Sequence, residues 1–171
     1  MPCGRWPPAA ASTWYKAYYN LLNLSAGIAA PPGFYGQDFN LLMEQAASAG
    51  LGVVAIRVMA GGALAGDTAR QGHASPSVGG AMAGGSDYDR DYQRAQAISA
   101  LVTEGKRTPP QAAVRFVLDS PFVSAALVGV SSVAQVAEAV ACSGSISLDE
   151  ATLARLRELW ATDFGLPAGG P

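Results

Sequence analysis

Two patterns of apolar residues divide the chain: short continuous apolar runs, and apolar residues spaced three or four positions apart. The continuous runs lie at 13–22 (TWYKAYYNLL), 51–59 (LGVVAIRVM) and 122–129 (FVSAALVG), and each predicts a β-strand. Because 51–59 shows no alternation of polar and apolar residues, it is typical of a parallel strand that is buried on both faces.

Helical spacing accounts for the segments between these strands. Loops are expected over 23–37 and 60–86, where proline and glycine interrupt both patterns. The predicted helices are one capped by Asp38 and ended by Gly50, one over 88–104 ended by Gly105, one capped by Thr108 with Pro109 first, one over 132–142, and one over 148–161 opened by a Ser147–Glu150 capping box.

The resulting order of strand, helix, strand, helix, helix, strand, helix, helix indicates βαβ units and a parallel sheet. The fold class is therefore α/β. We expect a disordered leader over 1–13, one folded domain over 14–164 and a disordered tail over 165–171.

Two of the predicted strands end in glycine turns. The strand at 51–59 continues into a glycine-rich segment that includes Gly61, and the strand at 122–129 ends at Gly129, before a helix that opens at Ser131 and Ser132. Backbone N–H groups at such turns and at the following helix start can bind phosphate. The alternative is that the two serines only cap their own helix.

Four segments carry a resemblance to a known family: YYNLLN (18–23), GVVAIRVMAGGALAG (52–66), 109–140 and SLDEATLARLREL (147–159). Together they resemble the C-terminal half of the aldo/keto reductases, which are NADP-dependent (β/α)8-barrel oxidoreductases of carbonyl compounds and alcohols. The resemblance implies a partial (β/α)8 TIM barrel. Its three parallel strands, with flanking helices, would be the sixth, seventh and eighth of the barrel.

The same resemblance implies an NADP(H) site. Residues after the second strand would flank the nicotinamide and pyrophosphate, and those after the third would meet the 2′-phosphate and adenine. The cofactor-binding residues implied in this way are Ile56, Arg57, Val58, Met59, Ala60, Gly61, Gly129, Ser131, Ser132, Gln135, Glu138 and Ala139.

Three of the matched positions depart from the family pattern. Ile56 stands where an aromatic ring commonly stacks on the nicotinamide, Lys16 where glutamine contacts the carboxamide, and Ala139 where asparagine often contacts adenine. Arg57 is a cation on the pyrophosphate path that could compensate for these changes. The alternative role for Arg57 is a salt bridge at the rim of the sheet.

The catalytic tyrosine, lysine, histidine and aspartate of the family come from the N-terminal half of its barrel, and we expect this chain to begin after them. Neither His73 nor the two lysines, Lys16 and Lys106, lie in matching contexts. The tyrosines of the first strand, Tyr15, Tyr18 and Tyr19, are interpreted as packing residues.

No catalytic residue is therefore predicted, and we expect the chain alone to be inactive. Asp87, Asp89 and Asp91 lack the spacing of a calcium loop and fit a helix start, so no metal is predicted either. Three alternatives stay open: a regulatory NADP(H)-binding module, a non-functional truncated remnant, or a fragment of another phosphate-binding barrel.

Composition and charge limit the classes of partner that this chain is expected to bind. The net charge is −2 and no lysine or arginine run stands out, which argues against nucleic acid. No apolar stretch approaches the roughly 20 residues of a membrane span, and Cys3 and Cys142 form no metal or CxxC pattern, so a cytoplasmic protein is expected. Three barrel strands leave two open edges, which predicts either a complementary N-terminal half-barrel chain or self-association through those edges.

Overall fold

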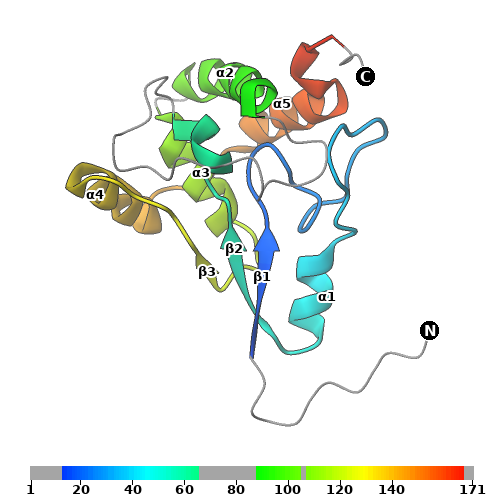
Figure 1. Ribbon diagram of the computed structural model, residues 1–171, viewed down its shortest axis with the longest axis vertical. Helices are drawn as coiled ribbons and strands as arrows, with labels where there is room; N and C mark the ends of the chain where they lie inside the picture. Colours follow the sequence, from blue (N-terminus) through cyan, green and yellow to red (C-terminus); the bar gives the residue numbers. More distant parts are fainter. Residues whose placement is uncertain (1–12, 66–87, 105–106, 168–171) are drawn as a thin grey trace.

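The computed structural model describes residues 13–65, 88–104 and 107–167, and its elements follow the predicted order (Figure 1). The predictions for Cys3, His73, Asp87, Gly105 and Lys106, and for most of the leader and tail, lie outside these residues. The helices and strands are β1 (Trp14–Tyr18), α1 (Leu42–Ser48), β2 (Gly52–Ile56), the 3₁₀ segment η1 (Ala60–Ala65), α2 (Tyr88–Glu104), α3 (Pro109–Leu118), β3 (Ala125–Ala126), α4 (Val133–Ala141), η3 (Cys142–Gly144), α5 (Glu150–Ala161) and η4 (Asp163–Gly165).

The three strands form one open parallel sheet in the order β1-β2-β3, as predicted. Trp14 pairs with Gly52 at the start of β1, and Ala55 pairs with Ala126 in β3. Within the described residues β1 and β3 each pair with β2 alone, so both outer strands have an edge without a partner. The structure is thus a mixed α/β fold with an open sheet and flanking helices.

All three strands are shorter than predicted, and β1 shows why. Its expected range of 13–22 stops at Tyr18 because the Asn20 side chain takes over the backbone groups that follow. Asn20 Oδ1 accepts hydrogen bonds from the amides of Leu22 and Asn23, both at 2.9 Å, which turns the chain out of the sheet. The last strand, predicted over 122–129, keeps two residues as an edge strand bonded on one side.

The start of α1 differs from its predicted cap. Asp38 Oδ1 accepts a hydrogen bond from Asn40 N at 2.8 Å, so it closes a turn, and the helix begins at Leu42. The predicted end is confirmed: Gly50 has φ 76°, and the N–H groups of Gly50 and Leu51 donate to the Ala47 and Ala46 carbonyls. This is a Schellman motif, in which glycine avoids the strain of a left-handed residue.

The later helix starts give one confirmation and one correction. Thr108 caps α3 with Pro109 at its first position, as predicted, and the structure adds a full capping box with Gln111. By contrast, Asp149 and not Ser147 caps α5, and its side chain accepts from Thr152 N at 2.7 Å. Ser147 lies two residues before the cap position because α5 begins at Glu150, and its hydroxyl donates to Asp119 Oδ1 at 2.7 Å.

A buried irregular segment over 19–26 lies at the centre of the core, directly after β1. Trp160 of α5 packs there and donates from Nε1 to the Leu21 carbonyl at 2.8 Å. Tyr19 stacks on Phe116 of α3, with ring centroids 5.0 Å apart. The predicted inner faces of α3 and α5 pack into this core.

None of the described helices is both long and apolar enough to cross a membrane.

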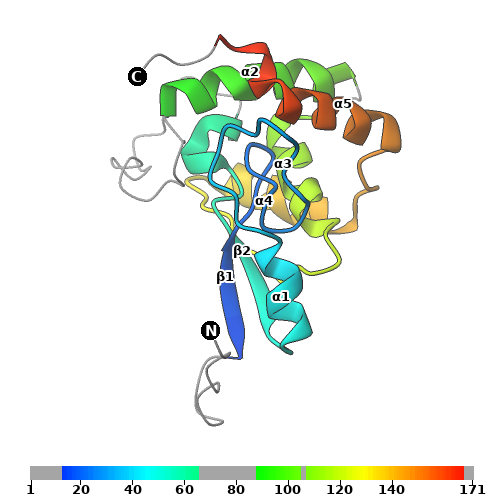
Figure 2. The same ribbon diagram turned by 90° about the vertical axis from the view of Figure 1, so that its right-hand side faces the viewer.

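A charged cluster joins α2 to the end of the chain, on the side of the molecule where Figure 2 shows α2 beside α5. Arg94 is buried, and it donates to Asp91 at 2.8 Å and to Asp163 at 2.7 Å. Its guanidinium carbon lies 3.5 Å from the ring centroid of Tyr35. Arg90 also binds Asp163, at 2.6 Å, so one carboxylate holds two cations of α2.

We predict that Asp163→Asn lowers the free energy of unfolding by about 2 kcal/mol, because two arginines lose their shared counter-charge and one of them is buried. Asparagine tolerates the left-handed backbone at this position (φ 47°), so the loss reports on charge. The matched control is Glu150→Gln, whose pair with Arg157 is exposed and contributes little. Urea unfolding measures both; equal effects from the two variants would contradict the prediction.

Candidate functional site

The two predicted glycine turns lie at the same end of the sheet, beyond the carboxyl ends of β2 and β3. Leu127 N donates to the Ala55 carbonyl at 2.8 Å, so β2 and β3 stay in register up to their carboxyl ends. The chain then leaves β2 at Arg57 and leaves β3 toward Gly129. In open α/β sheets ligands bind at this end. We therefore call the two turns, 57–61 and 128–132, the rim.

The β2 side of the rim is a strained and firmly held turn. Arg57 (φ 60°) and Ala60 (φ 47°) are both in the left-handed region, which is costly for residues other than glycine. The Arg57 carbonyl accepts hydrogen bonds from Asn20 Nδ2 at 2.9 Å and from Ala60 N at 2.8 Å. Since Asn20 is fully buried, its side chain fixes this turn to the core.

The predicted binding residues of this turn fall into two groups, one buried and one half-buried. Val58 and Ala60 are buried, so at most their backbone atoms can face a ligand. Ile56, Arg57 and Met59 are half-buried and keep exposed side-chain surface. Together with Gly61, also half-buried, they leave one cation and an apolar wall on this side of the rim.

The β3 side of the rim is already partly bonded to itself. Gln135 Oε1 accepts hydrogen bonds from Ser131 N at 2.7 Å and Ser131 Oγ at 3.1 Å. Gln135 N in turn donates to Ser132 Oγ at 3.2 Å, so Ser132 is the N-cap of α4. Ser132 therefore has the capping role that the sequence offered as the alternative, whereas the Ser131 hydroxyl is bonded to the Gln135 side chain. A phosphate that used the Ser131 amide would have to replace Gln135.

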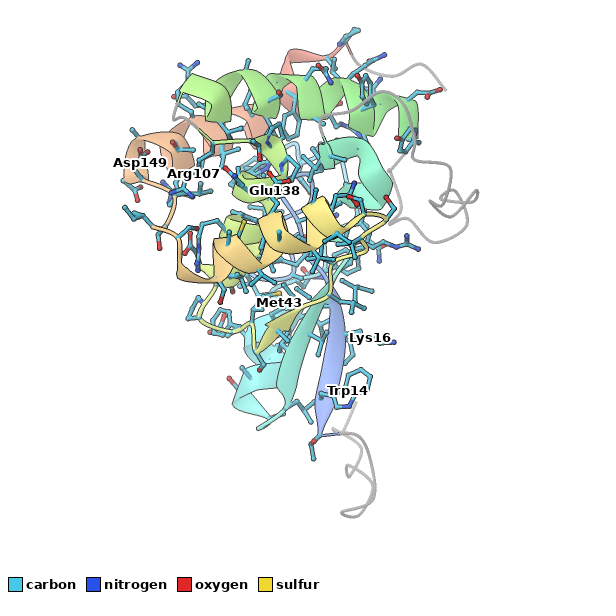
Figure 3. The ribbon with its side chains drawn as sticks, turned by 90° about the vertical axis from the view of Figure 1, so that its left-hand side faces the viewer. Trp14, Lys16, Met43, Arg107, Glu138 and Asp149 are labelled. Atoms are coloured by element: carbon cyan, nitrogen blue, oxygen red, sulfur yellow. The ribbon has the colours of Figure 1, made fainter. Side chains whose placement is uncertain are left out.

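The carboxylate of Glu138, one turn further along α4, is directed away from the rim. Ala139 has no polar side-chain atom to offer a ligand. Thr108 Oγ1 donates to Glu138 Oε1 at 2.6 Å, which directs this carboxylate to the start of α3. Figure 3 shows Glu138 beside α4, well above Lys16 and Trp14. Lys16 is in the middle of β1, with Nζ 5.5 Å from the Trp14 ring centroid, and so lies away from the rim.

The donor set of the rim fits the anionic part of a dinucleotide. Arg57 supplies a cation, and the first amides of α4 lack intrahelical acceptors because they begin the helix. Gly129 is exposed, its φ lies outside the left-handed region, and a Cβ there would meet nothing within 4 Å. Nothing in the fold requires glycine at this position, and the space above it is open to a ligand.

Two of the three strand tyrosines, Tyr18 and Tyr19, have the packing roles that were predicted, whereas Tyr15 is exposed. Tyr18 stacks on Phe39 with centroids 5.8 Å apart, and Tyr19 is buried against Phe116. Burial, with a contribution from Asp119, raises the pKa of the Tyr19 phenol above its ordinary value. Tyr35 is also buried and its pKa is raised, mainly by desolvation. Neither phenol is thereby made a better proton donor.

Comparison with known families agrees with this geometry. A model of the aldo/keto reductase family matches residues 37–161, which include β2, β3, α4 and both turns of the rim. The chain belongs to the aldo/keto reductase family. Its members are oxidoreductases that generally bind a nicotinamide cofactor, so the family supports an oxidoreductase-type function for this chain. A search of curated proteins found no match.

Sequence reasoning missed Asn20 and the arginine cluster. Asn20 was placed inside a strand, although an asparagine after an apolar run is also a turn signal. Asp91 was expected only to favour a helix start, yet it is buried against Arg94. The spacing of three residues between them is visible in the sequence and marks a helical ion pair.

We predict that Gly129→Ala leaves stability within about 0.5 kcal/mol of the parent, because its Cβ points into open space. The same methyl group should weaken NADPH binding severalfold if the cofactor approaches the backbone here. Gly144→Ala is the matched control, since its Cβ also meets nothing within 4 Å. Thermal unfolding and NADPH fluorescence titration test the pair, and equal affinities would argue against close approach at Gly129.

Proposed function

We propose that the rim holds NADP(H), with the pyrophosphate near Arg57 and the 2′-phosphate at the start of α4. The observation that carries the proposal is the register of β2 and β3, which brings the two turns to one end of the sheet. Family membership supports a nicotinamide cofactor, which when bound supplies the hydride of the family's chemistry. The residues of this chain would bind and orient the cofactor.

The likeness to NADP-dependent members makes the phosphorylated dinucleotide the preferred ligand. At the 2′-phosphate, the Ser132 hydroxyl and the first amides of α4 are the available donors, and the Ser131 hydroxyl joins them when the phosphate replaces Gln135. Glu138, the one carboxylate of α4, accepts from Thr108 Oγ1 and is therefore directed toward the start of α3. We further propose that β1, β2 and β3 correspond to strands six, seven and eight of a (β/α)8 barrel.

We also propose that the chain binds the cofactor without turning over carbonyl substrates. Carbonyl reduction in this family needs an acid that protonates the developing alkoxide. Two tyrosines of the described residues, Tyr19 and Tyr35, are buried against other aromatic rings, and burial raises the pKa of both phenols. A non-enzymatic NADP(H)-binding role therefore agrees best with the described residues.

We expect NADPH to bind with micromolar affinity and NADH at least tenfold more weakly. Ser131→Glu should abolish NADPH binding, because it sets a negative charge against the 2′-phosphate. Ser143→Glu, on the exposed segment after α4, adds the same charge elsewhere and should leave affinity unchanged. Fluorescence titration measures all three proteins. Unchanged binding by Ser131→Glu would move the phosphate site to another place.

Purified protein should show no carbonyl-dependent oxidation of NADPH above a blank, when assayed by absorbance with a panel of aldehydes and ketones. A blank preparation from the same host, carried through identical chromatography, controls for contaminating reductases. Turnover that copurifies with the chain and disappears in Ser131→Glu would refute the non-enzymatic proposal while supporting the cofactor site.

A further inference from the structure

The Asn20 side chain joins the core segment after β1 to the turn after β2. The two strands stay paired to their ends, because Tyr18 lies opposite Ile56 and Tyr19 N donates to the Ile56 carbonyl at 3.4 Å. Asn20 therefore lies beside Arg57, the first residue on the β2 side of the rim. Because Asn20 is fully buried, water does not compete for the hydrogen bonds of its side chain.

The neighbours of Asn20 determine which way its amide group faces. The side-chain oxygen accepts from two backbone N–H groups, those of Leu22 and Asn23, each at 2.9 Å. Only the oxygen of a carboxamide can accept, so the NH₂ group faces the other way and donates to the Arg57 carbonyl at 2.9 Å. One buried side chain thus closes the turn after β1 with its acceptor and holds the turn after β2 with its donor.

The turn that Asn20 holds has a costly backbone conformation. Arg57 and Ala60, with φ of 60° and 47°, are both left-handed, and such residues persist where the surrounding structure fixes them. The Arg57 carbonyl also accepts from Ala60 N at 2.8 Å, so Asn20 binds the turn at the atom that closes it. Because the Cα–Cβ bond turns with the backbone, this conformation determines the direction in which the Arg57 side chain leaves the chain.

We propose that Asn20 is a positioning residue for the cofactor, and that its NH₂ group holds Arg57 in the backbone conformation that presents the guanidinium to the pyrophosphate. This inference rests on the proposed function and deepens it, since it assigns part of the cofactor's affinity to a buried residue that does not touch the cofactor. The turn is ordered when the protein folds, so the cofactor does not have to order it. Asn20 therefore matters for ligands that reach the β2 side of the rim and not for ligands that bind only at the start of α4.

Asn20→Asp and its matched control, Asn23→Asp, test the role of the NH₂ group. Each variant replaces a buried NH₂ group by an oxygen and keeps the accepting oxygen, but Asn23 Nδ2 donates to the Gln37 carbonyl, at 3.0 Å, and not to the rim. Both variants should lose a similar amount of stability in urea, because each sets an oxygen against a backbone carbonyl. NADPH fluorescence titration should give an affinity about tenfold weaker for Asn20→Asp and an unchanged affinity for Asn23→Asp. Equal NADPH affinities in the two variants would overturn the inference.

Adenosine 2′-phosphate separates positioning from a general loss of structure. This probe contains only the part of the cofactor that is assigned to the start of α4, so Asn20→Asp should bind it as the parent does. Its binding is followed by the NMR shift of the Ser132 amide, at the N-cap of α4. If Asn20→Asp lost NADPH and adenosine 2′-phosphate in equal proportion, Asn20 would be a structural residue only.

A measurement on the parent protein covers the case in which Asn20→Asp does not fold. The Ala60 amide, which donates to the Arg57 carbonyl, should exchange its hydrogen slowly without cofactor and at about the same rate with NADPH bound. Fast exchange that NADPH slows by about tenfold or more would mean that the ligand sets the turn, and would refute the role of Asn20 alone. A parent that binds no NADPH would instead refute the proposed function itself.

Discussion

The structure depends on hydrogen bonds to the backbone of residues 19–26, a segment that follows β1 and stays buried in the core. Residues 19–26 have no regular structure, yet all are buried. A buried N–H or C=O without a partner costs as much as a lost hydrogen bond or more, so each needs an acceptor or donor supplied locally. Two side chains within the segment provide three of these partners: Asn20 Oδ1 accepts from the amides of Leu22 and Asn23, and Asn23 Oδ1 accepts from the amide of Ser25. Ser25 Oγ donates to Asn23 Oδ1 and so joins the same network.

These side chains also connect the core to the elements around it. Asn20 reaches the turn after β2, and Asn23 Nδ2 donates to the Gln37 carbonyl at 3.0 Å. Ser25 Oγ accepts from Phe39 N at 2.9 Å, which sets the entry into α1. The polar network thus couples the end of β1, the rim and the first helix. The left-handed residues at the rim persist because this network holds them, as strain of this kind requires.

The sequence predicted the features that depend on neighbours along the chain. The Thr108 cap of α3 and the glycine end of α1 were correct because each depends on residues within about five positions. The two incorrect caps, Asp38 and Ser147, were wrong because α1 and α5 begin later than expected, at Leu42 and Glu150. Distant partners hold the residues before both helices: the Leu41 amide donates to the Ser25 carbonyl, and the Ser147 hydroxyl donates to Asp119, 28 residues away. Local rules contain no information about such partners.

The same distinction applies to the rim. The sequence identified both turns, and the register of β2 and β3 brings them to the same end of the sheet. The sequence could not show that the Ser131 amide already donates to the Gln135 side chain. The two sides of the rim therefore differ in how far they are preorganised to bind a ligand. The β2 side is fixed by Asn20 before any ligand arrives, whereas the α4 side must exchange one internal hydrogen bond for each one that it makes to a phosphate through Ser131. Exchanges of this kind are nearly neutral in free energy, because a partner is lost as another is gained. Selectivity for a doubly charged phosphate over a neutral hydroxyl would then come from the charge of the anion against the helix start and Arg57, and hardly from the number of hydrogen bonds.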